Sequence, residues 1–111
     1  MNLLFICSRN KWRSPTAEKI FNNQFYRTKS AGTEEAARIK LTEKIINWAD
    51  LIFVMEKKHK ERIAQKFNHL MIEKTIIILD IEDDYQFMDE ELIDTLKITV
   101  QPYLDLFQQP D

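Results

Sequence analysis

A cysteine and an arginine lie six positions apart near the amino terminus, with residue types between them that suit the binding of a phosphate-like anion. Cys7 is the only cysteine, and Arg13 follows it after the polar segment 8–12. An apolar run at 3–6 predicts a strand before this segment, and a helical pattern follows it. Backbone N–H groups at the start of a helix can surround a tetrahedral anion, and a guanidinium group matches two of its oxygens. The residues expected to line this anion site are Ser8, Arg9, Asn10, Lys11, Trp12, Arg13 and Ser14.

The position of Cys7 allows two interpretations. A helix N-terminus and a nearby arginine favour the thiolate form of a cysteine, which would make Cys7 a nucleophile. A free cysteine at the end of a strand can also be a small buried hydrophobic residue. The loop and helix signals together favour the nucleophile.

An acidic stretch, residues 80–91, follows the apolar run at 76–79 and could supply a proton donor. A carboxylic acid that protonates a leaving oxygen contributes about 10²–10⁴-fold to a hydrolysis rate. The carboxyl ends of parallel strands share one edge of a sheet, so this stretch is expected to reach the rim near Cys7. Asp80, Asp83 and Asp84 are the candidate acids in this stretch.

Other interpretations of the acidic stretch remain open to different degrees. A solvated loop is the commonest role of such a run. A calcium loop is disfavoured, because Tyr85 stands where its sharp turn needs glycine. Tyr85, Phe87 and Met88 could form an apolar wall for an aromatic leaving group or could hold the loop against the core. No metal site is expected, and His59 and His69 are expected to lie on the surface.

The elements that must position these residues alternate between strand and helix. Strands are predicted at about 3–6, 26–30, 51–55 and 76–79, which implies an α/β fold with a small parallel sheet between two helical layers. Helices are predicted from a Ser14 N-cap to Phe25, over 34–48, over 57–67, and from residue 92 towards the carboxyl end, where Pro102 should kink or split the last one. The only glycine, Gly32, is expected to take a left-handed conformation in the turn 30–33.

Size and composition fit one domain over residues 1–111. Of the 111 residues, 44% are hydrophobic and 31% charged, and the formal net charge is −2. Such a balance argues against binding to nucleic acid or to an anionic membrane surface. The early apolar run is too short for a signal-peptide core or a membrane span. We therefore expect a cytoplasmic protein without disulfides.

The motif Cys7-x5-Arg13-Ser14-Pro15 resembles the signature of the low-molecular-weight protein tyrosine phosphatases, in particular a short bacterial branch of that family. The segments 30–33 (SAGT) and 49–55 (ADLIFVM) agree with this resemblance. It implies a four-stranded sheet in the order 2-1-3-4. It also implies roles for individual residues: Cys7 as nucleophile, Arg13 as phosphate ligand, Ser14 as a hydrogen-bond donor to the thiolate, Asn10 in a left-handed bend, and Ser30 as its support. Asp83, Asp84 and Tyr85 resemble the Asp-Pro-Tyr motif that carries the general acid of the family, with Asp in place of Pro. The resemblance therefore favours Asp83 as the acid, with Asp84 and Asp80 as close alternatives.

The sequence also departs from the family pattern. Arg9 stands where glycine is usual, and Trp12 stands where many members have a second, protective cysteine. The chain is shorter between residues 33 and 48 and at the carboxyl end. Because those regions help to form the substrate pocket of the family, substrate specificity is the property that transfers least.

The sequence thus predicts a cysteine-dependent phosphomonoester hydrolase that needs no metal or organic cofactor. Its expected substrate is a phosphorylated protein, in particular one carrying phosphotyrosine, or a small aryl phosphate. A phosphate- or phosphopeptide-binding module with little turnover is the alternative. Thiol-based arsenate reduction ranks low, because the chain has no further cysteine to regenerate Cys7.

Overall fold

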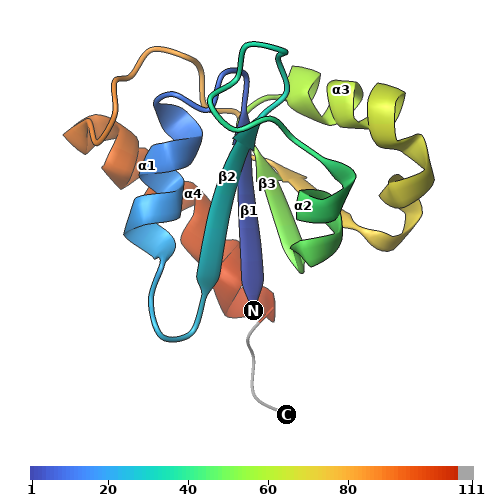
Figure 1. The fold of residues 1–111 in the computed structure, drawn as a ribbon. Coiled ribbons are helices and arrows are strands. Elements are labelled where there is room, and N and C mark those ends of the chain that lie inside the picture. The colour runs from blue at the N-terminus through green and yellow to red at the C-terminus, as the bar shows by residue number, and fades with distance from the viewer. Residues whose placement is uncertain (108–111) are drawn as a thin grey trace.

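The computed structural model describes residues 1–107, which form a parallel four-stranded sheet between two layers of helices (Figure 1). The strands are β1 (Asn2–Cys7), β2 (Arg27–Gly32), β3 (Leu51–Val54) and β4 (Thr75–Ile78). Their order is β2-β1-β3-β4, and all three pairings are parallel. The predicted fold class and strand order are therefore confirmed. No helix within the described residues is long and apolar enough to span a membrane.

Helices cover both faces of this sheet. The first helix, α1 (Arg13–Phe21), lies with α4 (Glu90–Phe107) on one face, and α2 (Glu43–Trp48) lies with α3 (Lys57–Phe67) on the other (Figure 1). A 3₁₀-helix, η1 (Asn68–Glu73), leads from α3 to β4. Because all four strands are parallel, their carboxyl ends lie at the same edge of the sheet. The loops that follow β1, β2 and β3 meet at the top of the molecule in Figure 1.

The central strand β1 is apolar throughout because both of its faces are buried. Leu3, Phe5 and Cys7 face α1 and α4, whereas Leu4 and Ile6 face α2 and α3. This alternation follows from the period of two residues in a strand. It places Cys7 at the carboxyl end of the sheet, on the face that α1 covers.

The predicted helix over 34–48 is wrong in its first half, because only α2 is helical there. Thr42 caps α2 by accepting a hydrogen bond from the Ile45 N–H at 3.2 Å. The preceding residues form a loop that follows β2, and Gly32 exchanges backbone hydrogen bonds with Ile39 and Leu41. Several N–H groups of this loop bind the segment after Cys7, so they are not available to a helix.

The first and last helices also differ from their predictions. Helix α1 begins at Arg13 after Trp12 and ends at Phe21, so Ser14 lies inside it rather than at the N-cap. The prediction that Pro102 splits the last helix is wrong, because α4 is one helix with Pro102 inside it. Proline removes one backbone donor from a helix, and here the rest of the helix continues on either side of it.

The role expected for Gly32 is also wrong. Its φ is not positive; the left-handed residues among those described are Asn10 (φ 56°), Asp80 (57°) and Met88 (62°). A Cβ on Gly32 would lie 2.6 Å from the carbonyl oxygen of Ser8 and 2.6 Å from the Cβ of Ala37. Glycine is needed here because the backbone of residues 8–10 and the side chain of Ala37 approach β2 closely, not because of its torsional freedom.

Candidate active site

The segment between β1 and α1 is held from outside by the loop after β2. Four consecutive carbonyl oxygens, those of residues 7–10, accept hydrogen bonds from Thr33, Glu34 and Arg38 at 3.0–3.1 Å. Within residues 1–107, no hydrogen bond is donated by the backbone N–H groups of residues 9–12. With its carbonyl groups engaged on one side, the segment leaves these N–H groups free on the other. This arrangement suits an anion.

A chain of hydrogen bonds runs behind this segment to the sulfur atom of Cys7. The side-chain amide of Asn10, a residue in the left-handed conformation, donates to Ser14 Oγ and to Ser30 Oγ, both at 2.8 Å. Ser30 donates in turn to the Glu18 carboxylate, and Ser14 Oγ lies 2.9 Å from Cys7 Sγ. Because Ser14 accepts from Asn10, its own hydrogen is free to point at the sulfur. The chain therefore suits a thiolate at position 7.

Sequence reasoning placed all of these residues except Glu18. Its contact with Ser30 was not predicted, although Glu18 lies four residues after Ser14 on α1 and so shares a face of that helix with it.

Arg13 is the largest fully buried side chain, with 1% of its surface exposed. One terminal nitrogen, Nη1, donates to Glu56 at 2.5 Å and to the carbonyl of Ile81 at 2.8 Å. Its Nε has no hydrogen-bond partner within the described residues, and the nearest carboxylate oxygen, from Asp83, is 3.5 Å away. A buried N–H without a partner is costly. An anion above the loop would supply that partner.

Sequence reasoning did not predict the role of Glu56, which follows β3 by two positions. Burial alone would raise the pKa of Glu56, but the hydrogen bond and charge of Arg13, helped by Lys58, lower it below its usual value. Glu56 is therefore ionised at neutral pH. It fixes one end of the guanidinium while the Nε edge remains available.

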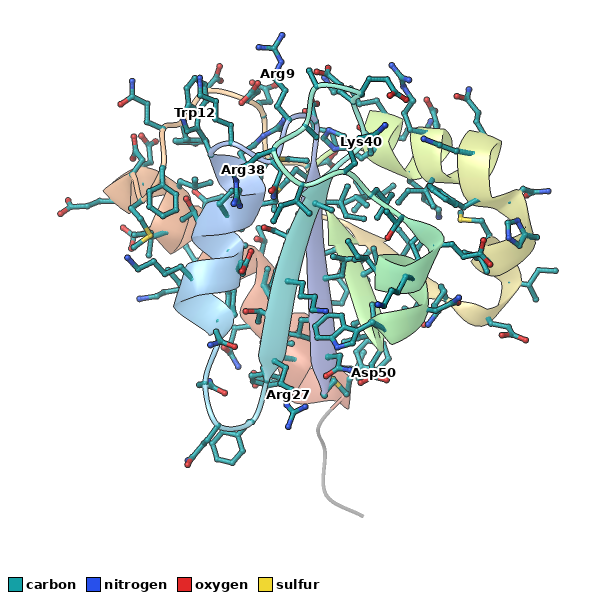
Figure 2. The ribbon with its side chains drawn as sticks, viewed as in Figure 1. Arg9, Trp12, Arg27, Arg38, Lys40 and Asp50 are labelled. Carbon is teal, nitrogen blue, oxygen red and sulfur yellow. The ribbon has the colours of Figure 1, made fainter. Side chains whose placement is uncertain are left out.

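A hollow of about 290 Å³ collects most of the predicted site residues. Asn10 and Ser14 lie behind it, in the hydrogen-bond chain. Arg9, whose side chain is exposed and pairs with Glu34 at 3.2 Å, projects from the top of the molecule in Figure 2. The lining residues are Cys7, Ser8, Arg9, Lys11, Trp12, Arg13, Glu34, Lys58 and Asp83.

The three candidate acids are placed differently. Asp83 lines the same hollow as Cys7, with its side chain half-exposed. Asp80 lines a separate hollow with residues that include Glu56 and Glu82, and Asp84 is exposed and lines neither. Of the three, Asp83 is therefore the one that shares a hollow with the sulfur atom.

Of the two roles expected for Tyr85, Phe87 and Met88, the structure shows attachment of the loop, and none of the three lines the hollow that contains Cys7. Tyr85 packs against the core cluster beneath α1 and α4. The backbone N–H of Met88 donates to Thr16 on α1 at 2.9 Å, which holds the loop to that helix. Phe87 is exposed and lines a different hollow beside α1.

The surface position expected for His59 is wrong: the residue is 1% exposed. Its Nδ1 accepts from the backbone N–H of Glu56 at 3.0 Å, and its Nε2 lies 2.9 Å from Ser8 Oγ. Burial, together with the charge of Arg13, lowers its pKa to about 4. Because Nδ1 accepts, the proton of the neutral ring is on Nε2 and is donated to Ser8, whose own hydrogen can then point into the hollow.

A sequence signal for this burial exists. His59 lies four residues before the buried Ile63 on α3, so the two share one face of the helix. His69 is exposed as expected, 3.6 Å from Glu43. Within residues 1–107, no group of three or more His, Cys, Asp or Glu side chains is placed to hold a metal ion.

Comparison with known proteins gives a likeness in structure rather than in sequence. The chain matches no protein-family model and no curated protein sequence. Among solved structures it is similar to a low-molecular-weight protein tyrosine phosphatase from T. tengcongensis, with a TM-score of 0.72 and 23% identity over 97% of this chain and 98% of that one. This chain has the fold of the low-molecular-weight phosphatases.

Two further structures support this likeness. The YwlE arginine phosphatase from Geobacillus stearothermophilus has a TM-score of 0.67 at 22% identity, covering 99% of this chain and 98% of that chain. The tyrosine phosphatase Wzb from Escherichia coli K30, in complex with phosphate, has a TM-score of 0.71 at 20% identity, covering 95% of this chain and 96% of that chain. The phosphatase fold thus extends over nearly the whole chain.

Proposed function

We propose that this protein is a cysteine-dependent phosphomonoester hydrolase. One observation carries the proposal: Cys7 Sγ, free backbone N–H groups and the unpartnered Nε of buried Arg13 all border one hollow. These are a nucleophile and the donors that a phosphoryl group needs during transfer. The phosphatase fold adds support, because its solved examples include tyrosine and arginine phosphatases.

In the first step of the proposed reaction, the Cys7 thiolate attacks phosphorus in line with the leaving oxygen. The S–P bond forms as the P–O bond breaks, and Asp83 gives its proton to the departing oxygen. Arg13 and the loop N–H groups hold the three equatorial oxygens while their charge redistributes.

In the second step, water attacks the phosphocysteine while Asp83, now a carboxylate, takes one of its protons. The S–P bond breaks, inorganic phosphate leaves, and the Ser14 hydroxyl stabilises the released thiolate. A related case supports this route: one YwlE arginine phosphatase variant carries a phosphorylated serine in its active site.

Phosphotyrosine is the substrate that the rim of the hollow favours. Trp12 offers an aromatic wall, and the ammonium group of Lys11 lies 4.7 Å from the centre of its ring. Phosphoarginine is the second candidate, because arginine phosphatases share the fold. Four cationic side chains line the hollow against two carboxylates, those of Glu34 and Asp83. This excess of positive charge opposes a guanidinium leaving group, so we place phosphotyrosine first.

The test is hydrolysis of p-nitrophenyl phosphate and of matched peptides carrying phosphotyrosine or phosphoarginine. We expect turnover by the wild-type protein, none by Cys7→Ala, and a loss of about 10²–10³-fold in Arg13→Ala. Asp83→Asn should lower kcat by about 10²-fold or more, with Asp84→Asn as the matched control that keeps its activity. Alanine is preferable to serine at position 7, because a serine could itself accept the phosphoryl group.

Trapping of the phosphocysteine distinguishes the proposed hydrolase from the alternative, a binding module with little turnover. Acid quenching during turnover, followed by mass spectrometry, should find the phosphoryl group on Cys7. Tight binding of phosphate or phosphopeptide without turnover or a phosphorylated Cys7 would instead establish the binding module and overturn the proposed hydrolase.

A further inference from the structure

We propose that a second, larger hollow beside the phosphate site binds an acidic segment of the substrate polypeptide, next to its phosphorylated residue. The phosphate site is the hollow of about 290 Å³ that contains Cys7. This inference rests on the proposed function, because it concerns the same site. The larger hollow measures about 640 Å³ and follows α1 from residues 8–12 between β1 and α1 (the phosphate loop) towards the amino end of β2. Its lining residues are Lys11, Trp12, Pro15, Glu18, Lys19, Asn22, Thr28, Arg38 and Phe87.

The hollow adjoins the phosphate site. Lys11 and Trp12 line both, so a chain that leaves the phosphate site over these two side chains enters it directly. Trp12 and Arg38, which both line the hollow, lie near the amino end of α1 in Figure 2. An occupant covalently linked to the phosphorylated residue therefore fits better than an independent small molecule.

The charge of the hollow is opposite to that of the whole protein. Lys11, Lys19 and Arg38 line it, and none of them forms an ion pair within residues 1–107, although the net charge of the chain is −2. Among the described residues, Glu18 is the only carboxylate in the lining, and it accepts a hydrogen bond from Ser30. Three cationic side chains without ion pairs, beside one carboxylate that is already hydrogen-bonded, favour an anionic occupant.

The cations are also held in place. Arg38 donates through Nε to the carbonyl of Asn10 at 3.1 Å, which leaves its terminal nitrogens for a carboxylate. The ammonium groups of Lys11 and Lys19 lie 4.7 Å from the ring of Trp12 and 5.8 Å from that of Phe87. The two rings and Pro15 add apolar surface for the stem of a Glu or Asp side chain. The chemistry is that of an acidic peptide.

The test compares phosphotyrosine peptides that carry three Glu or three Gln residues on one side of the phosphotyrosine, each side in turn. For the wild-type protein we expect kcat/KM to be about tenfold higher for one of the Glu peptides than for its matching Gln peptide, the difference that one to three exposed charge pairs would give. At high salt, kcat/KM of that Glu peptide should fall towards the value of the Gln peptide. Lys19→Glu should reduce this preference to about twofold or less. Lys44→Glu is the matched control: it makes the same charge change on exposed α2, away from every hollow described above, and should retain the preference.

Two readouts separate this inference from the proposed hydrolase. The rate with p-nitrophenyl phosphate, which does not reach the larger hollow, should be the same in wild type and Lys19→Glu. Peptide binding to Cys7→Ala, followed by fluorescence anisotropy, needs no turnover and should show the same acidic preference. Equal values for Glu and Gln peptides in both assays, or a preference that survives Lys19→Glu, would overturn the inference even if the protein is a phosphatase. An acidic preference in binding, without hydrolysis of any substrate, would support the larger hollow and refute the hydrolase.

Discussion

Lowering the pH from 7.5 to 5.0 is expected to destabilise this protein through His59. The residue is buried between Ser8 and the backbone of Glu56, and burial, together with the charge of Arg13, lowers its pKa from 6.5 to about 4. A histidine with a lowered pKa in the folded state stabilises the fold fully above its unfolded pKa. That stability is lost as the pH falls from about 6.5 through 4, because the unfolded chain takes up the proton first.

The size of the effect follows from the two pKa values. At pH 5.0 an unfolded histidine is almost wholly protonated, whereas about nine folded molecules in ten keep His59 neutral. The difference in proton uptake between pH 7.5 and 5.0 amounts to about 2 kcal/mol of unfolding free energy. That is a large share of the roughly 5–15 kcal/mol that holds a typical domain together.

Urea unfolding, followed by circular dichroism at both pH values, measures this loss. The free energy of unfolding of His59→Gln should fall by about 2 kcal/mol less than that of the wild type between pH 7.5 and 5.0, whatever the effect of the substitution on stability at pH 7.5. His69→Gln is the matched control, since it makes the same substitution at an exposed histidine outside the site. If His59→Gln loses as much stability on acidification as the wild type does, or if NMR titration gives His59 an ordinary pKa, the reasoning is refuted.

Three further predictions concern the phosphate loop. Gly32→Ala would put a Cβ 2.6 Å from the carbonyl oxygen of Ser8; we expect a loss of about 1–3 kcal/mol in urea unfolding and lower activity. Ser30→Ala removes an acceptor of the Asn10 amide and should lower kcat about tenfold with little change in KM, measured with p-nitrophenyl phosphate; a change in KM alone would argue against this role. Hydrogen peroxide should convert Cys7 to the sulfinic acid, because the chain has no second cysteine; recovery of activity with dithiothreitol after prolonged exposure would contradict this.

The sheet was predictable because its signals are local and strong. Each central strand is a short apolar run buried on both faces, and the Cys7–Arg13 segment lies between such a strand and a helix. Position relative to these elements was enough to bring Asp83 to the rim of the same hollow. Such inferences need only the alternation of elements and the rule that parallel strands end at one edge.

The errors have a common cause in contacts between segments far apart in the sequence. Residues 34–42 have apolar positions that suggest a helix, but the backbone N–H groups of Glu34 and Arg38 bind the phosphate loop and that of Leu41 binds β2. His59 lies on a helix rich in charges, yet it is buried because Ser8 and Glu56 meet it from other elements. Glu56 stands in an ordinary polar turn, and only the fold brings it to Arg13.

These long-range contacts also explain how the phosphate loop keeps its form with arginine at position 9. Arg9 does not have a positive φ, so glycine is not required there by backbone geometry. The one left-handed residue of the loop is Asn10, whose side chain is fixed by Ser14 and Ser30. The loop carbonyl groups are bound from residues 33–38, and the close approach at Gly32 makes those short bonds possible. The loop is therefore shaped by its neighbours more than by its own sequence, and replacing Arg9 with glycine should change the rim charge without raising the intrinsic rate of the phosphoryl transfer that we propose.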